Sequence, residues 1–292
     1  MRIGTHLIAT GGVPISELRD EAAAVTARGL DSLWANQLPG GMDPLGLLLA
    51  VGDGPAELAT AIVPTYPQHP IVMATSALTV QSLTGGRLTL GVGPSHATFI
   101  TGQFGIPYTS PARHTREYLE VLRPLLRGEH VKYAGEFFTV DTQLAIDVAT
   151  PPPVLVSALG PRMLEVARDL ADGTIAVWTQ PSTVADYLVP RLADGARVAA
   201  AVMTSVSTDP DGVREAVARD FGIVNDLPAY RAILDRGGLS GPADTVVTGD
   251  EKTVLRELAR YREAGVTDLI VTPLGSRAER DRTLDVAAQL DR

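Results

Sequence analysis

The stretch Val154–Trp178 reads VLVSALGPRMLEVARDLADGTIAVW and contains one complete strand–helix–strand unit. An apolar strand is expected at its start, a helix at Pro161–Leu170 and a second apolar strand at Gly173–Trp178. Proline is tolerated in the first turn of a helix, so Pro161 indicates where the helix begins. Such units build parallel sheets covered by helices.

The same alternation extends to both sides of this stretch. Eight short apolar strands, each followed by a helical segment, favour a closed (β/α)8 TIM barrel over an open doubly wound sheet of about five or six strands. The 292 residues suit a fold that typically has about 250 residues before insertions. Besides the two strands above, strands are expected at Arg2–Ile8, Asp31–Asn36, Leu58–Val63, Leu88–Gly93, Ala199–Ser205 and Asp268–Thr272.

Helices are expected between these strands, with one departure from the alternation. The segment EHVKYAGEFFTV (Glu129–Val140) alternates in polarity and turns at Ala134-Gly135, which predicts a small hairpin insertion near 129–140. No linker-like stretch divides the chain, so a single domain is expected over 1–292. The main helices are expected at Pro70–Leu83, Pro111–Arg127, Pro161–Leu170, Thr183–Leu192, Asp211–Arg236, Glu251–Ala264 and Ala278–Leu290.

Composition excludes several classes of function. The chain has 25 Lys and Arg against 34 Asp and Glu, a net charge of −9, so a nucleic-acid partner is not expected. Cysteine is absent, and the five histidines show no spacing typical of a zinc site, so no metal is expected. No segment has the length and apolarity of a membrane span, and we expect a cytoplasmic protein without a membrane partner.

In a TIM barrel, chemistry belongs at the carboxyl ends of the strands. His6 follows the first expected strand, Gln37 the second, GVGPSH (Gly91–His96) belongs to the fourth, and SALGPRM (Ser157–Met163) to the fifth. The first six strand ends contain no paired carboxylates, which disfavours glycoside and metal-assisted hydrolysis.

The segment ALGP (Ala158–Pro161) suits a phosphate. Glycine and proline at the opening of a helix leave backbone N–H groups pointing outward, at the positive end of the helix dipole. Arg162 follows as a charge partner for the phosphate. The alternative is that Gly160-Pro161 only turns the chain.

Longer strings resemble the luciferase-like monooxygenase superfamily. TAIVPTYPQHPIVMA (Thr60–Ala74) and SLTGGRLTLGVGPSH (Ser82–His96) are similar to its third-to-fourth-strand region. Val154–Trp178 resembles its fifth-strand phosphate loop and sixth strand, and VLRELARYREAGVTDLIVTP (Val254–Pro273) its closing helix and eighth strand. The resemblance implies a TIM barrel that binds FMN or the deazaflavin coenzyme F420, and a homodimer. GPS after the fourth strand and ALGP after the fifth look closest to the branch that uses F420.

The resemblance also implies cofactor-binding residues. It places a non-proline cis peptide at Ala61-Ile62, before Val63, as a support for the cofactor ring. Trp178 is implied beside the ring or substrate, although a core aromatic at a strand end is an equal alternative. The other implied cofactor-binding residues are Gly93, Pro94, Ser95 and His96 beside the cofactor, and Ser157, Ala158, Leu159, Gly160, Pro161 and Arg162 at the phosphate loop.

One departure from the family's pattern bears on the reaction. Many deazaflavin-dependent relatives have Ser-Asp-His after the second strand, where this chain has Asn36-Gln37-Leu38. Alcohol oxidation through that histidine is therefore disfavoured, and Gln37 occupies the acidic position. His96 is the first candidate for a general acid, with His6 as the second, since histidine titrates near neutral pH. A structural hydrogen-bonding role is the alternative for each.

The sequence therefore predicts an F420-dependent oxidoreductase that reduces a C=C or C=N bond of a small organic substrate. An FMN-dependent monooxygenase and a non-catalytic flavin- or deazaflavin-binding protein are the alternatives. The apolar stretches Pro44–Val51 and Ile71–Val80 are richer in Leu, Ala and Val than one helix face requires, which is consistent with a homodimer.

Overall fold

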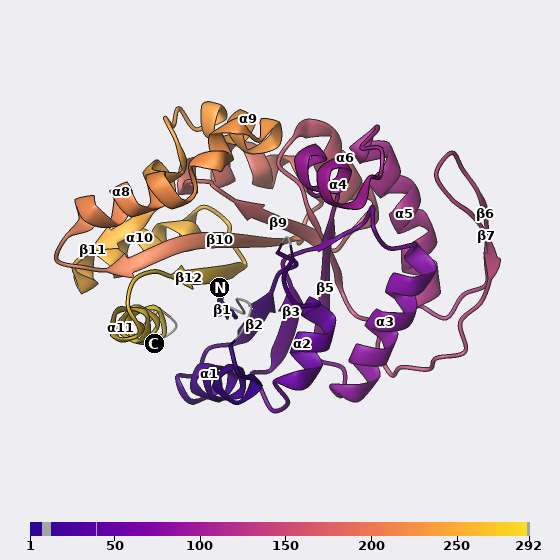
Figure 1. Ribbon diagram of the computed structural model, residues 1–292, viewed down its shortest axis with the longest axis horizontal. Coiled ribbons are helices and arrows are strands. Elements are labelled where there is room, and N and C mark those ends of the chain that lie inside the picture. Colours follow the sequence, from indigo (N-terminus) through magenta and orange to yellow (C-terminus); the bar gives the residue numbers. More distant parts are fainter. Residues whose placement is uncertain (8–12, 39, 291–292) are drawn as a thin grey trace.

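The computed structural model describes residues 1–7, 13–38 and 40–290, and these form a TIM barrel (Figure 1). Eight parallel strands close into a ring in the order β1, β2, β3, β5, β8, β9, β10 and β12, with β12 paired again to β1. The predicted fold class is confirmed. The strands are β1 (Arg2–His6), β2 (Ser32–Ala35), β3 (Glu57–Thr60), β5 (Leu88–Gly93), β8 (Val154–Ser157), β9 (Gly173–Val177), β10 (Arg197–Val206) and β12 (Asp268–Pro273).

Helices surround the barrel and bury one face each against it (Figure 1). In α5 (Pro111–Leu126), for example, Leu119, Leu122 and Leu126 recur at helical spacing and are buried. The other helices are α1 (Ile15–Ala27), α2 (Pro44–Ala50), α3 (Pro70–Leu83), α4 (Ala97–Phe104), α6 (Pro161–Leu170), α7 (Pro181–Thr183), α8 (Pro210–Asp220), α9 (Pro228–Arg236), α10 (Glu251–Glu263) and α11 (Arg277–Ala287). None of the helices in the described part of the chain combines the length and the apolarity that crossing a bilayer requires.

The barrel interior is filled by side chains. Trp34 is fully buried and its Nε1–H donates to Ser32 Oγ at 2.8 Å. A Cβ on Gly4 would lie 2.9 Å from that same Nε1, so only glycine leaves room for the indole at this position. The middle of the barrel is therefore a packed core, and space for a ligand remains only at its ends.

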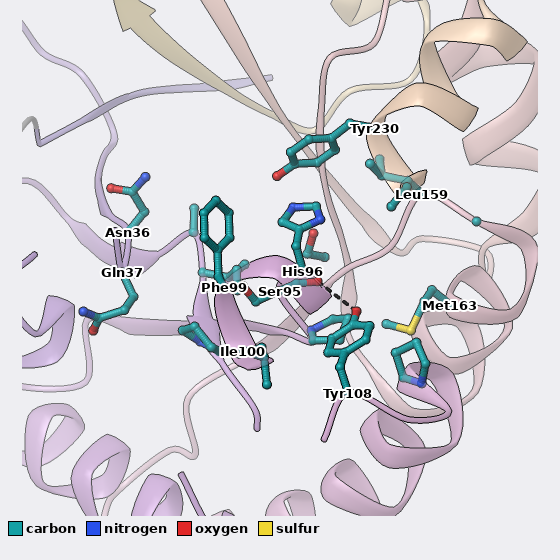
Figure 2. A pocket seen from close by; sticks show the side chains of 18 of the residues that line it. Asn36, Gln37, Ser95, His96, Phe99, Ile100, Tyr108, Leu159, Met163 and Tyr230 are labelled. Carbon is teal, nitrogen blue, oxygen red and sulfur yellow. Dashed lines mark hydrogen bonds between the residues drawn. The ribbon is translucent and has the colours of Figure 1, made fainter. Parts of the chain in front are cut away.

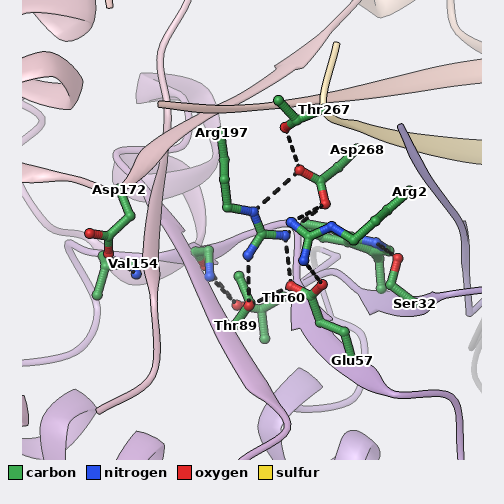
Figure 3. A network of polar contacts seen from close by, with 12 residues as sticks. Arg2, Ser32, Glu57, Thr60, Thr89, Val154, Asp172, Arg197, Thr267 and Asp268 are labelled. Carbon is green, nitrogen blue, oxygen red and sulfur yellow. Dashed lines mark hydrogen bonds and ion pairs between the residues drawn. The ribbon is translucent and has the colours of Figure 1, made fainter. Parts of the chain in front are cut away.

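The amino-terminal end of the barrel is closed by a network of charges (Figure 3). Arg197 on β10 donates to Glu57 Oε1 at 2.7 Å, to Asp268 Oδ1 at 2.8 Å and to Thr89 Oγ1 at 3.1 Å. Arg2 pairs with the same two carboxylates, at 3.0 Å from Glu57 and 2.7 Å from Asp268. The network therefore links β1, β3, β5, β10 and β12.

The structure differs from the expected elements in several places. The third strand is not continuous over Leu58–Val63: β3 ends at Thr60, and the short β4 (Val63–Pro64) follows a cis peptide bond at Ala61-Ile62. The helix expected over Thr183–Leu192 is α7 followed by a π-helical turn, η1 (Val184–Leu188), and a 3-10 turn, η2 (Val189–Arg191). The stretch 211–236 is α8, the 3-10 helix η3 (Gly222–Asp226) and α9. Ile8 of the first expected strand lies outside the described residues.

Three elements were not expected from the sequence: α4, the 3-10 helix η4 (Pro242–Thr245) and β11 (Val247–Gly249). β11 pairs with residues 204–206 at the carboxyl end of β10 and is not part of the closed ring. The predicted hairpin is present as β6 (Val131–Ala134) and β7 (Thr139–Thr142), and it lies beside α5 (Figure 1). There the buried Glu117 accepts hydrogen bonds from the N–H groups of Glu136 and Phe137.

Candidate active site

A cavity of about 410 Å³ opens at the carboxyl ends of the barrel strands (Figure 2). Its walls come from the ends of β2, β3, β5 and β8, from α4, and from η1 and α9. The volume lies in the range of ligand pockets, and the lining combines an apolar majority with a few polar groups, which is typical of small-molecule sites.

Ten of the residues proposed from the sequence line this cavity together. The Ala61-Ile62 peptide bond is cis, as the resemblance implies. These residues arrive from four separate strand ends, so the closure of the barrel is what brings them together. They are Gln37, Ala61, Ile62, Pro94, Ser95, His96, Ser157, Leu159, Gly160 and Pro161.

His6, the second candidate acid, does not line the cavity. Its Nδ1 lies 2.7 Å from Thr272 Oγ1, and its buried Nε2 has no partner among the described residues. Burial lowers the pKa of His6 to about 4, so the ring is neutral at physiological pH. The structure therefore does not bring His6 into this cavity with the other candidates: its half-buried ring lies beside β12 and lines a separate, smaller hollow next to α1 and α11.

Five other proposed residues also lie outside the lining. Val63 and Ala158 are buried. Gly93 packs behind the cavity wall, where a Cβ would lie 2.9 Å from Ser157 Cβ. Arg162 is exposed outside the cavity, so the expected charge contact from its side chain is not supported. Trp178 is 6% exposed, and its ring centroid lies 6.2 Å from that of Tyr230, behind the lining.

His96 occupies the central wall of the cavity, at the N-cap of α4. Its ring meets those of Tyr230 and Phe99 edge to face, with centroids 4.4 Å and 5.9 Å away. Burial lowers the pKa of His96 below its usual 6.5, so the imidazole is mostly neutral at pH 7. Once protonated, such an imidazole gives up its proton more readily than an exposed histidine does.

A hydrogen bond from a neighbouring tyrosine holds the backbone beside His96. Ser95 has a φ of 60°, an uncommon value for a residue other than glycine, and its carbonyl oxygen accepts a hydrogen bond from Tyr108 Oη at 2.9 Å (Figure 2). Tyr108 stacks on Tyr66, which stacks in turn on His114 at 3.8 Å. Burial lowers the pKa of His114 to about 4, so this stack is uncharged at neutral pH.

The Leu159-Gly160 turn, where the sequence predicts a phosphate loop, opens α6 at the edge of the cavity. Gly160 is the N-cap residue, in an extended conformation with a φ of −92°. A Cβ built on it would meet nothing within 4 Å, so the protein leaves open space directly in front of the helix. The first N–H groups of a helix have no intrahelical acceptor, and here they are available to an anion.

Charge is sparse around the cavity. Among the described lining residues, Arg236 is the only charged side chain and no carboxylate is present. Within the same described part of the chain, no three His, Asp or Glu side chains are grouped so that they could hold a metal ion. The lining therefore suits a neutral reacting group with an anion at one edge.

The sequence reasoning missed the aromatic and α9 side of the cavity. Phe99 and Ile100 belong to the unexpected α4, and Tyr108 lies in the connection before α5. Tyr230 and Arg236 come from α9, which was expected only as part of a long helical stretch. Nothing local in the sequence distinguishes these residues from surface or core positions, since their role depends on where α9 packs.

Fold and site together define a TIM-barrel protein with a small-molecule pocket at its carboxyl face. The chain belongs to the luciferase-like monooxygenase family, whose model matches residues 1–268. It is 25% identical over 297 residues to a 5,10-methylenetetrahydromethanopterin reductase of Methanopyrus kandleri, with 83% of each chain covered. It is 30% identical over 211 residues to an F420-dependent glucose-6-phosphate dehydrogenase of Nakamurella multipartita, which covers 66% of this chain and 61% of the relative.

A solved structure supports the same fold. An F420-dependent secondary alcohol dehydrogenase in complex with an F420-acetone adduct superimposes with a TM-score of 0.82 and 19% sequence identity. The match covers 99% of this chain and 97% of that chain. At this level of identity the likeness concerns the barrel and its connections.

Proposed function

We propose that this protein is an F420-dependent oxidoreductase that reduces a C=C or C=N bond of a small organic substrate. One observation carries the proposal: Ala61 and Ile62, the Pro94–His96 segment and the Leu159-Gly160 turn line a single cavity that lacks carboxylates in its described lining. Relatives whose names include F420 dependence or reductase activity support the choice of cofactor and reaction class.

The residues present fit such a cofactor. Ala61 and Ile62 would support the ring, and the open space at Gly160 would admit the phosphate to the first N–H groups of α6. The deazaflavin, when bound, supplies a hydride to the substrate. The chain's own part is to orient the substrate against the apolar wall of Phe99 and Ile100 and to exclude water from it.

A proton must follow the hydride, and His96 is the proposed route for it. The imidazole lines the cavity, and His6 does not. Because burial lowers the pKa of His96, the ring would be protonated mainly in mildly acidic solution, or would pass on a proton taken from water. Gln37 lines the cavity as an uncharged amide, which disfavours alcohol oxidation by a base at that position.

The cofactor test is a titration. Purified protein is titrated separately with F420 and with FMN while cofactor and protein fluorescence are followed. We expect saturable binding of F420 and weaker binding of FMN. Tight FMN binding without a response to F420 would favour the FMN-dependent monooxygenase, whereas F420 binding without turnover of any C=C or C=N substrate would favour a non-catalytic binding protein.

We also propose a homodimer, but fewer exposed apolar residues support it than the sequence predicts. Most of the apolar residues of Pro44–Val51 and Ile71–Val80 are buried by the chain's own core. Val72 and Leu83 on α3 remain 54% and 70% exposed, and they are the apolar side chains that a second copy would cover.

A further inference from the structure

Two arginines lie against one tyrosine ring beside the active-site cavity. The Cζ atoms of Arg191 and Arg236 are 4.2 Å and 3.8 Å from the ring centroid of Tyr187. Since both are held by the same ring, the two guanidinium groups lie within about 8 Å of each other. They line a second hollow of about 330 Å³ together with Ser182, Thr183 and Gly237.

Neither guanidinium has a carboxylate partner in the part of the chain that the structure describes. Within the described residues, neither arginine forms an ion pair, and the one hydrogen bond recorded for Arg191 goes to the Tyr187 carbonyl oxygen at 2.8 Å. Asp186 lines the same hollow but pairs with neither arginine. By contrast, Arg231 on the same helix as Arg236 pairs with Asp235 at 2.8 Å. Both arginines are exposed, so water screens their mutual repulsion, and a bound anion would lower it further.

Tyr187 connects this hollow to the active-site cavity. Its side chain and that of Arg236 line both spaces. Tyr187 is only 5% exposed, yet its Oη has no hydrogen-bond partner among the described residues. A buried hydroxyl without a partner is unfavourable, and a bound polar group would relieve it. Tyr187 lies on the π-helical turn η1, a conformation that frequently occurs at functional sites.

We propose that Arg191, Arg236 and Tyr187 form an anion subsite that binds a carboxylate or phosphate of a molecule held in the active-site cavity. Arginine suits this task because its planar fork of donors matches both groups. Gly160 and Arg236 line the same cavity, so an anionic chain could pass from the α6 loop to the arginines. Two sources fit this chemistry: the acidic tail of a bound deazaflavin cofactor, which rests on the proposed function, or an anionic substrate.

The experiment compares Arg191→Gln and Arg236→Gln with the wild type. Arg219→Gln is the matched control, because Arg219 is exposed on α8 and, among the described residues, pairs only with its neighbour Asp220. Dissociation constants are measured for F420, for the same deazaflavin lacking phosphate and tail, and for inorganic phosphate with and without saturating F420. Circular dichroism checks that each variant is folded.

If the cofactor supplies the anion, each variant weakens F420 binding at least tenfold and leaves the tail-less deazaflavin unchanged. If the substrate supplies it, F420 affinity is kept, and phosphate binding to the F420-loaded protein is lost in both variants. If no F420 binds at all, arginine-dependent phosphate binding to the free protein would still support the subsite while the cofactor proposal fails. Folded variants that match the wild type in all four titrations would overturn the subsite.

Discussion

The imidazole of His96 meets the phenol ring of Tyr230 edge to face, with centroids 4.4 Å apart and ring planes at 66°. The contact joins the end of β5 to α9 across the cavity mouth (Figure 2). Burial acts on both groups in the direction that keeps them uncharged: the pKa of His96 is lowered, and the pKa of Tyr230 is raised to about 12. At neutral pH the pair therefore presents a neutral imidazole and a protonated phenol.

The lowered pKa of His96 predicts the pH dependence of turnover. A step that needs a proton on the imidazole is fastest below that pKa and slows as pH rises through it, so substrate reduction should decline with a midpoint below 6.5. His96→Ala should lower turnover by about a hundredfold, within the usual range for loss of a general acid, and should flatten the profile. Steady-state rates between pH 5 and 8 test this; an unchanged profile in the variant would assign the proton to water or substrate.

The Tyr230 ring is predicted to set that midpoint. Tyr230→Ala should expose His96 to water and raise its pKa towards 6.5, because burial of the imidazole is what lowers it. Tyr230→Phe keeps the ring and should leave the midpoint in place. The pKa of His96 can be read directly by NMR titration of the imidazole protons, and equal pKa values in the two variants would contradict the explanation.

A side chain at Gly160 is predicted to weaken cofactor binding without lowering the stability of the fold. Gly160→Val should leave stability nearly unchanged, because its Cβ would meet nothing within 4 Å and the φ of −92° suits any residue. The same side chain would block the approach of a phosphate to α6, so cofactor affinity should fall at least tenfold, about 1.4 kcal/mol. Gly222→Val, also free of contacts within 4 Å and outside the cavity lining, is the control for fluorescence titration. Wild-type affinity in folded Gly160→Val would mean that this residue only turns the chain.

Arg197 is predicted to matter for stability. Arg197→Met removes the central cation. Among the described residues it leaves Asp268, which is 1% exposed, and Glu57 with the more exposed Arg2 as their only cationic partner, besides the hydroxyls of Thr267 and Thr89. Breaking a buried pair on one side costs about 3 to 5 kcal/mol, and we expect the free energy of unfolding in urea to fall by about 3 kcal/mol. Arg219→Met should change it by less than about 0.5 kcal/mol. A loss below about 1 kcal/mol for Arg197→Met would show that the network contributes little.

The proposed dimer predicts a concentration-dependent mass. Light scattering at micromolar concentration should give twice the monomer mass of 30.8 kDa. Leu83→Glu should shift the mass towards the monomer, because it places a charge on the more exposed of the two apolar side chains of α3. The matched change Ile223→Glu, at a residue of η3 that is 51% exposed, should have no effect on the mass. A wild-type protein that remains monomeric contradicts the proposal.

Local patterns were sufficient to predict much of the barrel. α3, β5 and α6 begin and end where prolines, glycines and apolar runs indicate. α4 was missed because ATFITGQF has neither charges nor a clear helical periodicity. β11 was missed because a three-residue strand gives no pattern, and its existence depends on the length of β10. The third strand is interrupted between Thr60 and Val63, which local propensity does not predict.

For the site, too, local patterns and topology predicted some residues, whereas residues placed by tertiary packing were missed. Residues carried by strand ends, such as His96 and Gly160, could be proposed from barrel topology and resemblance. Tyr187, Tyr230 and Arg236 could not, because they reach the cavity only through the packing of η1 and α9 on the barrel. His6 lies outside the cavity for a related reason: a strand-end position does not say whether a side chain faces the mouth of the barrel or the surrounding helices.

The charged network of Arg197 and the ligand cavity lie at opposite ends of the same eight strands. Substitutions that alter the ligand cavity can therefore accumulate without disturbing the charged network that stabilises the barrel. Loops and helices around the mouth can change in sequence or length and so alter which substrates bind. The charged network at the other end meanwhile holds the barrel strands together. A laboratory search for altered substrate range should accordingly randomise Phe99, Ile100 and Tyr230 and leave Glu57, Arg197 and Asp268 untouched.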